Sequence, residues 1–305
     1  MHRALRPLVL AVAAATVMVA CARVPYSGRR QFNMIPNGIM HSLGKSTYQS
    51  MLSERRVDKT SSDAQVLRRV GQRMTRASGE TKYSWTYKLL AEDTINAWCV
   101  PGGYIAFYTG ILPALETEAS MAFVMGHEIG HVVAHHGAER MSQKLAVLGG
   151  MAGLSAYVGG KSQLTDTQKA VILGALGVGA QYGILLPFSR KHEHEADVIG
   201  MMTMAKAGYP PAESIETWDR LERIGGSHAA FLSTHPSYKS RKETQREWMG
   251  KARKRYQRNA LGYDTTESLW MSSGSRSSSS SSSSSGSKSR KKKKSGGKRQ
   301  HPQHP

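Results

Sequence analysis

The segment His127-Glu128-Ile129-Gly130-His131 constrains this chain more than any other feature. On a helix, residues four apart lie one turn above each other, with roughly 5–6 Å between Cβ atoms, so His127 and His131 can bind one tetrahedral Zn²⁺. Glu128 is offset by one residue, which suits it to hold and deprotonate a water at the metal. The preceding residues 118–125 are largely apolar, and no proline follows as far as Arg140. This setting predicts a helix inside a core rather than a surface helix with two unrelated histidines.

A zinc site needs a further ligand, and residues 189–197 offer carboxylates about sixty residues downstream. Glu193 and Asp197 share one helix face, so one carboxylate can bind the metal while the other accepts the free ring N–H of a ligand histidine. Glu195 is rotated by about 200° from Glu193, at roughly 100° per residue, and cannot point to the same metal. We therefore expect Glu195 to be replaceable with most of the zinc retained. The alternative interpretation is a helix start whose acidic residues favour the helix dipole.

Four stretches together resemble a known family: residues 96–105, 127–142, 189–197, and 233–237 followed by Arg241. The chain is similar in these stretches to the gluzincin zinc metallopeptidases that include HtpX and the CAAX prenyl protease, and most of all to the periplasmic lipoprotein members BepA and LoiP. The stretches occur in the family's order across most of residues 25–250. The resemblance implies a zinc endopeptidase with one Zn²⁺ per chain, His127, His131 and Glu193 as its ligands, and Glu128 as general base.

The same resemblance assigns His235 to the neighbourhood of the metal. There it would stabilise the oxyanion of the tetrahedral intermediate or cap the zinc in a resting state. A lone histidine before proline is otherwise a plain loop residue. His135 departs from the family, which often has arginine there, and this departure concerns substrate preference. His136 and His192 are interpreted as outer or packing residues, and Cys99 as a small buried residue rather than a ligand.

The predicted fold class is α+β: a zincin-like metallopeptidase domain, mostly helical with a small β-sheet. Residues 83–89 alternate as a half-buried strand should, and residues 104–108 form a strand after the Pro-Gly-Gly turn. The strand at 104–108 is a candidate edge, to which an extended peptide could add, although an ordinary hairpin explains the pattern equally well. Helices are expected around residues 66–74, 212–224 and 237–258.

Residues 1–20 are predicted to be a secretory signal peptide. Basic residues precede an apolar run from Leu8 to Ala20, which is shorter than the roughly 20 residues of a membrane span. Residues 18–21 resemble a bacterial lipobox, so Cys21 is the expected lipidation site at the start of a lipidated segment, 21–45. Pairing of Cys21 with Cys99 is the alternative.

The metallopeptidase domain is predicted to span residues 46–260. Within it, two Gly- and Ala-rich stretches at 145–187 are interpreted as buried helices that line or cover the cleft, with a membrane hairpin as the alternative. A Ser/Lys-rich tail follows at 261–305 and is disordered by composition. The tail carries nine of the basic residues behind the formal net charge of +20, so the folded part is less basic than the whole chain.

These features favour a zinc metalloendopeptidase on the periplasmic side of a bacterial membrane, in particular the outer membrane. By resemblance, its substrates would be misfolded or misassembled envelope proteins. The lipid anchor and the basic tail would attach it to the membrane, and a secreted chain argues against nucleic acid as a partner. The alternative is a chaperone-like assembly factor for outer-membrane proteins that uses the zinc site structurally. An intact Glu128 argues against a purely structural site, which would normally close the metal with a fourth protein ligand.

Overall fold

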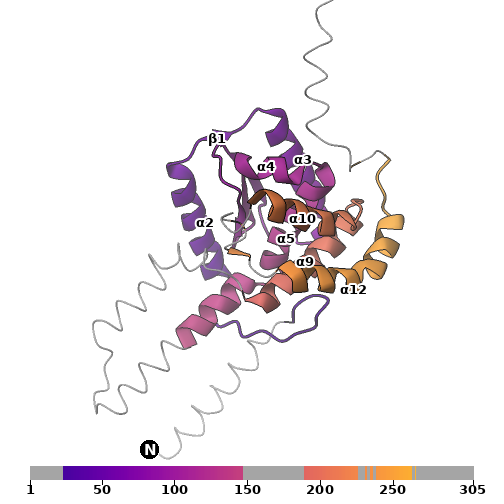
Figure 1. The fold of residues 1–305 in the computed structure, drawn as a ribbon. Coiled ribbons are helices and arrows are strands. Elements are labelled where there is room, and N and C mark those ends of the chain that lie inside the picture. The colour runs from indigo at the N-terminus through magenta and orange to yellow at the C-terminus, as the bar shows by residue number, and fades with distance from the viewer. Residues whose placement is uncertain are drawn as a thin grey trace, which may run out of the picture. The chain divides into compact units, whose positions relative to one another are not determined.

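The computed structural model describes residues 23–146, 189–225 and 238–262, together with Phe231, Thr234, His235 and Thr265. The predicted signal peptide, Cys21 and the greater part of the 145–187 stretches lie outside the described residues. The chain divides into two units between residues 269 and 270. The second unit holds most of the predicted tail and also lies outside the described residues. The described part of the first unit has the predicted α+β class, with helices around a small mixed sheet (Figure 1).

The sheet has four strands in the order β1-β2-β4-β3. Their bounds are β1 Val57–Asp58, β2 Thr86–Leu90, β3 Ala97–Val100 and β4 Tyr104–Tyr108. β4 pairs with β2 in parallel and with β3 antiparallel, and the hairpin between β3 and β4 turns through residues 101–103. Gly102 and Gly103 have φ of 109° and 85°, values that other residues rarely adopt, so this turn requires glycine.

The prediction that residues 104–108 form an edge strand is wrong. β4 lies between β2 and β3, and the edge beside it is β3. β4 takes this place because it pairs in parallel with β2 as well as antiparallel with its hairpin partner β3. Ile105, Ala106 and Phe107 are fully buried, so both faces of β4 are covered as well.

Helices cover the sheet and form most of the described chain. They are α2 Asn37–Ser53, α3 Ser62–Ser78, the 3₁₀ turn η1 Thr109–Ile111, α4 Leu112–Leu115, α5 Glu118–Val133, α9 Arg190–Lys206, α10 Glu213–Gly225 and α12 Tyr238–Gln257. Residues 136–146 are also helical. α3 buries Leu67, Val70 and Met74, so the predicted helix exists, although Val66 is only half-buried.

α5 and α9 form the centre of the domain and lie against each other at close range. Each begins with a side-chain cap: Thr117 accepts a hydrogen bond from the Ser120 amide, and Ser189 accepts one from the His192 amide. A Cβ at Gly130 would lie 2.8 Å from the Ala196 carbonyl oxygen, so only glycine permits this separation of the two backbones. The close approach brings the histidines of α5 opposite the carboxylates of α9.

The remaining contacts involve both ends of the predicted domain. α12 packs on α9 through an apolar cluster that includes Met201, Met249 and Ala252. The predicted boundary between residues 45 and 46 falls inside α2. The Thr265 carbonyl accepts a hydrogen bond from the Ala119 amide, so contacts with the domain extend past the predicted end at residue 260.

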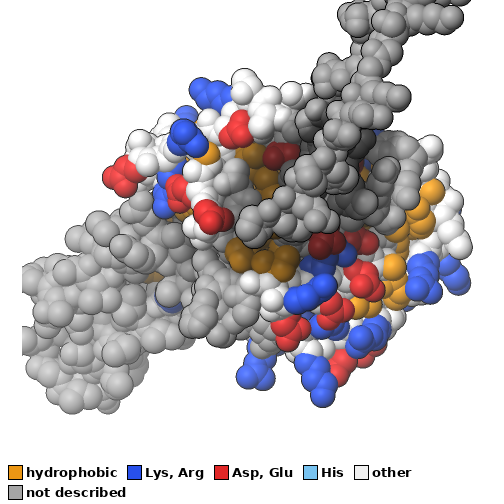
Figure 2. Space-filling model, turned by 45° about the horizontal axis from the view of Figure 1, so that its top comes forward, with side chains coloured by type: hydrophobic (Ala, Val, Ile, Leu, Met, Phe, Trp, Pro, Cys, Tyr) orange, Lys and Arg blue, Asp and Glu red, His pale blue; other side chains and the backbone are white. Residues whose placement is uncertain are grey.

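Two properties of the described surface bear on membranes. No helix among the described residues is both long and apolar enough to cross a membrane. Figure 2 shows basic and acidic side chains interspersed on the face in view. This mixture agrees with a folded part that is less basic than the whole chain.

Candidate metal centre

Four side chains from three parts of the chain converge on one buried point. His127 and His131 come from α5, Glu193 from α9, and His235 from the residues just before α12. One potential ligand atom from each lies within 4.8 Å of those of the others. His127 Nε2 is 3.1 Å from both His131 Nε2 and His235 Nδ1, and Glu193 Oε1 is 3.4 Å from His131 Nε2. The structure therefore brings together every residue that the sequence proposed as a ligand or cap.

His127 is held by a carboxylate and an arginine behind it. Its Nδ1 lies 2.9 Å from Asp197 Oδ1, which leaves Nε2 facing the other ligand atoms. Arg241 donates from Nε and Nη2 to the two oxygens of Asp197, each at 2.7 Å. Burial alone would raise the pKa of Asp197, but the charge of Arg241 and its hydrogen bonds outweigh this and hold the pKa at about 2. Asp197 is thus an ionised acceptor at neutral pH.

The protonation states of the two helix histidines suit metal binding. Burial lowers the pKa of His127 and lowers that of His131 further, since neighbouring imidazoles add to the effect. Both rings are therefore neutral at pH 7 and carry a lone pair. His131 Nδ1 lies 3.0 Å from His136 Nδ1, which leaves its Nε2 toward the cluster.

Glu128 and His235 lie against each other beside the cluster. Burial raises the pKa of Glu128 to about 7, and its Oε1 lies 3.4 Å from His235 Nε2. A pKa near the working pH suits a group that first takes and then returns a proton. Burial lowers the pKa of His235, but the charges of Glu193 and Glu128 outweigh it and the net shift is upward.

The donor set fits zinc. Imidazole nitrogens and one carboxylate oxygen are the ligands of catalytic zinc sites, and three of them with an open position are the usual number. A carboxylate behind a ligand histidine is also typical of such sites. Two observations match this chemistry: the two neutral imidazoles of α5, and the Asp197 carboxylate on the outer nitrogen of His127.

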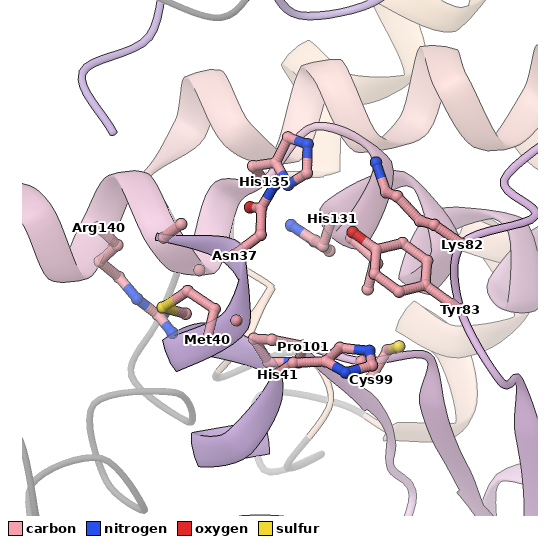
Figure 3. A pocket seen from close by; sticks show the side chains of 15 residues that line it. Asn37, Met40, His41, Lys82, Tyr83, Cys99, Pro101, His131, His135 and Arg140 are labelled. Atoms are coloured by element: carbon pink, nitrogen blue, oxygen red, sulfur yellow. The ribbon is translucent and has the colours of Figure 1, made fainter. Parts of the chain in front are cut away.

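A pocket of about 240 Å³ opens beside the cluster, with His131 in its wall (Figure 3). Tyr83 and Lys82 line one side and Met40 and Arg140 the other. Cys99 of the edge strand β3 lines it as well, so this residue is half-buried at the cleft rather than in the core.

Several residues at the site escaped sequence reasoning. Glu195 does not join the ligand cluster, as expected, but its Oε2 lies 3.0 Å from His136 Nε2, and so it belongs to the support of His131. The expectation that Glu195 can be replaced with most of the zinc retained did not take this contact into account. Arg29 and Glu139 also belong to this support. Arg241 was visible only as part of the family resemblance, and no local signal marks Arg29.

Comparison with known proteins places the site in a family. Residues 61–249 match the model of "Peptidase family M48". This range contains both helices of the metal cluster, His235 and Arg241, and the metallopeptidases of this family use zinc.

The relatives come from both mitochondria and bacteria. The chain is 32% identical over 235 residues to the mitochondrial metalloendopeptidase OMA1 of Schizosaccharomyces pombe, covering 75% of this chain and 66% of the relative. It is 38% identical over 161 residues to the mitochondrial metalloendopeptidase OMA1 of Arabidopsis thaliana, covering 52% and 30%. It is 28% identical over 190 residues to a putative beta-barrel assembly-enhancing protease of Vibrio cholerae, covering 58% and 37%. The chain thus spans from about a third to two thirds of these relatives' lengths, and the mitochondrial matches were not anticipated from the sequence.

Proposed function

This chain belongs to peptidase family M48, and from that premise we propose that it is a zinc-dependent metalloendopeptidase that cleaves unfolded or misassembled proteins. The observation that supports the proposal is the position of Glu128. Its carboxylate is buried beside three potential zinc ligands and beside His235, and its pKa of about 7 suits proton transfer. A purely structural metal site does not require a buried carboxylate that can transfer a proton beside its ligands.

Each residue of the site has its own role in the proposed reaction. Zinc held by His127, His131 and Glu193 would polarise the scissile carbonyl and lower the pKa of a water that it binds. Glu128 accepts a proton from the attacking water and delivers it to the leaving nitrogen. Asp197 and Arg241 fix the orientation of His127 throughout. His235 has two candidate roles, as a donor to the oxyanion or as a cap on the metal in a resting state.

The edge strand β3 supplies a place for an extended substrate. The Cys99 backbone amide lowers the pKa of Glu128 as a nearby donor, so the edge strand β3 lies next to the proposed base. A peptide that pairs with this side would place its backbone along the cleft by main-chain hydrogen bonds alone. The pocket beside His131 would then receive a side chain next to the scissile bond. This mode of binding suits unfolded chains, because it requires an extended backbone and no single sequence.

The location of the reaction is part of the proposal. The lipobox-like residues 18–21 and the similarity to a beta-barrel assembly-enhancing protease support a lipid-anchored enzyme on the periplasmic side of a bacterial membrane, acting on envelope proteins. The basic tail would add attraction to anionic headgroups. The mitochondrial relatives are also metalloendopeptidases, so they support the enzymatic activity. The bacterial compartment is supported only by the lipobox-like residues and the bacterial relatives.

The test is metal-dependent cleavage of an unfolded protein by the purified chain. Zinc content is measured first, and reduced, carboxymethylated casein is then offered with and without 1,10-phenanthroline. We expect about one zinc per chain, cleavage at internal peptide bonds, loss of cleavage with the chelator and recovery on adding zinc. Bound zinc with no cleavage, together with suppressed aggregation of an unfolded protein, would support the assembly-factor alternative.

A further inference from the structure

A segment at the start of the described chain reaches the support of the metal site. Residues 23–35 run past the N-terminal end of α9 and the helical residues 136–146, below them in the view of Figure 1. Arg29, in this segment, donates from Nη1 and Nη2 to the two oxygens of Glu139, at 2.5 and 2.7 Å. It also donates from Nε and Nη2 to the two oxygens of Glu195, at 2.8 and 2.9 Å. One guanidinium therefore pairs with two carboxylates, whose side chains are only 4% and 6% exposed.

The contacts continue from Glu195 to a metal ligand. Glu195 Oε2 lies 3.0 Å from His136 Nε2, and His136 Nδ1 lies 3.0 Å from His131 Nδ1. A carboxylate only accepts, so the Nε2 of the neutral His136 ring carries the proton and its Nδ1 accepts. His131 must then donate from Nδ1, and its Nε2 keeps the lone pair that faces His127 and Glu193. The chain of contacts thus selects the one tautomer of His131 that can bind metal.

A second carboxylate holds the plane of the intermediate ring. His192 stacks on His136 with ring centroids 4.4 Å apart, and its Nε2 lies 3.1 Å from Glu139 Oε2. Gln31 donates to the same Glu139 oxygen at 3.0 Å. His136 is fully buried, so solvent cannot replace these contacts. Arg29 therefore fixes both carboxylates that determine how His136 lies.

The two histidines of α5 are supported in parallel ways. His127 contacts Asp197, which is held by Arg241. His131 reaches Glu195 through His136, and Glu195 is held by Arg29. The first set lies inside the range that matches the family model, whereas Arg29 precedes that range, which begins at residue 61.

We propose that Arg29, Glu195 and His136 are positioning residues for the metal ligand His131, and that the N-terminal segment 23–35 is thereby part of the metal site. The inference rests on the proposed zinc site but not on proteolysis, so zinc binding itself is the readout. Outer partners of a ligand histidine typically change metal affinity by about 10–100-fold.

The experiment compares shape-preserving variants of the full chain. Zinc dissociation constants are measured by competition with a chromophoric chelator for the parent, Glu195→Gln, Arg29→Lys and the double variant. We expect Glu195→Gln to weaken zinc binding by about 10–100-fold and Arg29→Lys by about tenfold, because an ammonium cannot hold two carboxylates in fixed geometry. The double variant should be weaker than Glu195→Gln by less than the factor for Arg29→Lys alone, because Arg29 acts partly through Glu195 and partly through Glu139.

A matched control and a spectroscopic readout separate positioning from stability. Arg69 Nη2 pairs with the buried Glu118 on the same helix α5 at 2.7 Å, so Arg69→Lys should leave zinc affinity at the parental value. In spectra of zinc-loaded protein with ¹⁵N-labelled histidine, the Nδ1–H signal of His131 should move in Glu195→Gln and stay in Arg69→Lys. Parental zinc affinity in both Glu195→Gln and Arg29→Lys would overturn the inference alone. A parent chain that binds no zinc would overturn it together with the proposed function.

Discussion

Arg241 and Asp197 form a fully buried ion pair in which two nitrogens of the guanidinium donate to the two carboxylate oxygens, each at 2.7 Å. The pair joins α12 to α9 directly behind the ligand His127. Arg241 also approaches Glu193, with Nη1 2.8 Å from Oε2. One buried cation therefore balances two carboxylates of the site.

Removing this cation should damage both the fold and the metal site. Arg241→Gln leaves Asp197 buried without its charge partner, and breaking a buried pair in this way costs about 3–5 kcal/mol. We expect a fall of this size in the free energy of unfolding, measured with urea, and weaker zinc binding because His127 loses its fixed acceptor. The neighbouring Lys242 is the control: it pairs with Asp219, which is 48% exposed, and Lys242→Gln should cost less than about 1 kcal/mol. Equal losses for the two variants would contradict this interpretation.

Replacing Glu193 or Asp197 of α9 by its amide should affect zinc binding to different extents. Glu193→Gln removes a ligand oxygen and should lose zinc, whereas Asp197→Asn removes only an outer acceptor and should weaken zinc binding or activity by about 10–100-fold. Zinc measured in both purified variants, after equilibration with the same free-zinc buffer, checks the order. Zinc retained by Glu193→Gln and lost by Asp197→Asn would reverse the assignment.

Replacing His235 should distinguish a cap on the metal from a donor to the oxyanion. Its Nδ1 lies 3.1 Å from His127 Nε2 and 3.2 Å from Glu193, within the ligand cluster. If it occupies a metal position in the resting state, His235→Ala should keep zinc on the other three ligands and cleave casein faster than the parent. The rate constant at saturating casein decides between the two roles, because loss of an oxyanion donor would instead lower it by about 10²–10³-fold.

Local spacing predicted those pairs of site residues that lie on one helix. His127 and His131 follow from a separation of four residues, and so does the shared face of Glu193 and Asp197. The apposition of α5 and α9 was not predictable in the same way. It depends on close approach at Gly130, where the backbone of the other helix occupies the position of a Cβ. Glycine within a helix signals such contact only once the partner helix is known.

Long-range contacts account for what the sequence did not reveal. Arg29 and Glu195 are 166 residues apart, and nothing in the pattern around Arg29 marks it as a partner of a metal site. The position of β3 at the sheet edge was also missed, because a hairpin around the Pro-Gly-Gly turn does not say which of its strands pairs with β2. The apolar run in β4 did not decide this, because the edge strand β3 is almost as apolar and as buried as β4.

Cys21 should determine attachment to the membrane. Cys21→Ser removes the thiol that lipidation requires, so incorporation of an alkyne palmitate analogue should be lost and the protein should leave the membrane fraction. Cys99→Ser should keep both label and location, since Cys99 lies at the cleft. Labelling that persists in Cys21→Ser, or that disappears in Cys99→Ser, would rule out Cys21 as the anchor.

The most direct test of the central claim is zinc content and casein cleavage in Glu128→Gln, with Glu222→Gln as the control at a residue whose side chain is 57% exposed. The amide cannot take a proton from water, while the three ligands are unchanged. We predict parental zinc content and melting temperature with cleavage reduced by several orders of magnitude, against no change in Glu222→Gln. Cleavage by Glu128→Gln at close to the parental rate, with zinc bound, would contradict the assignment of Glu128 as the base and with it the proposed mechanism.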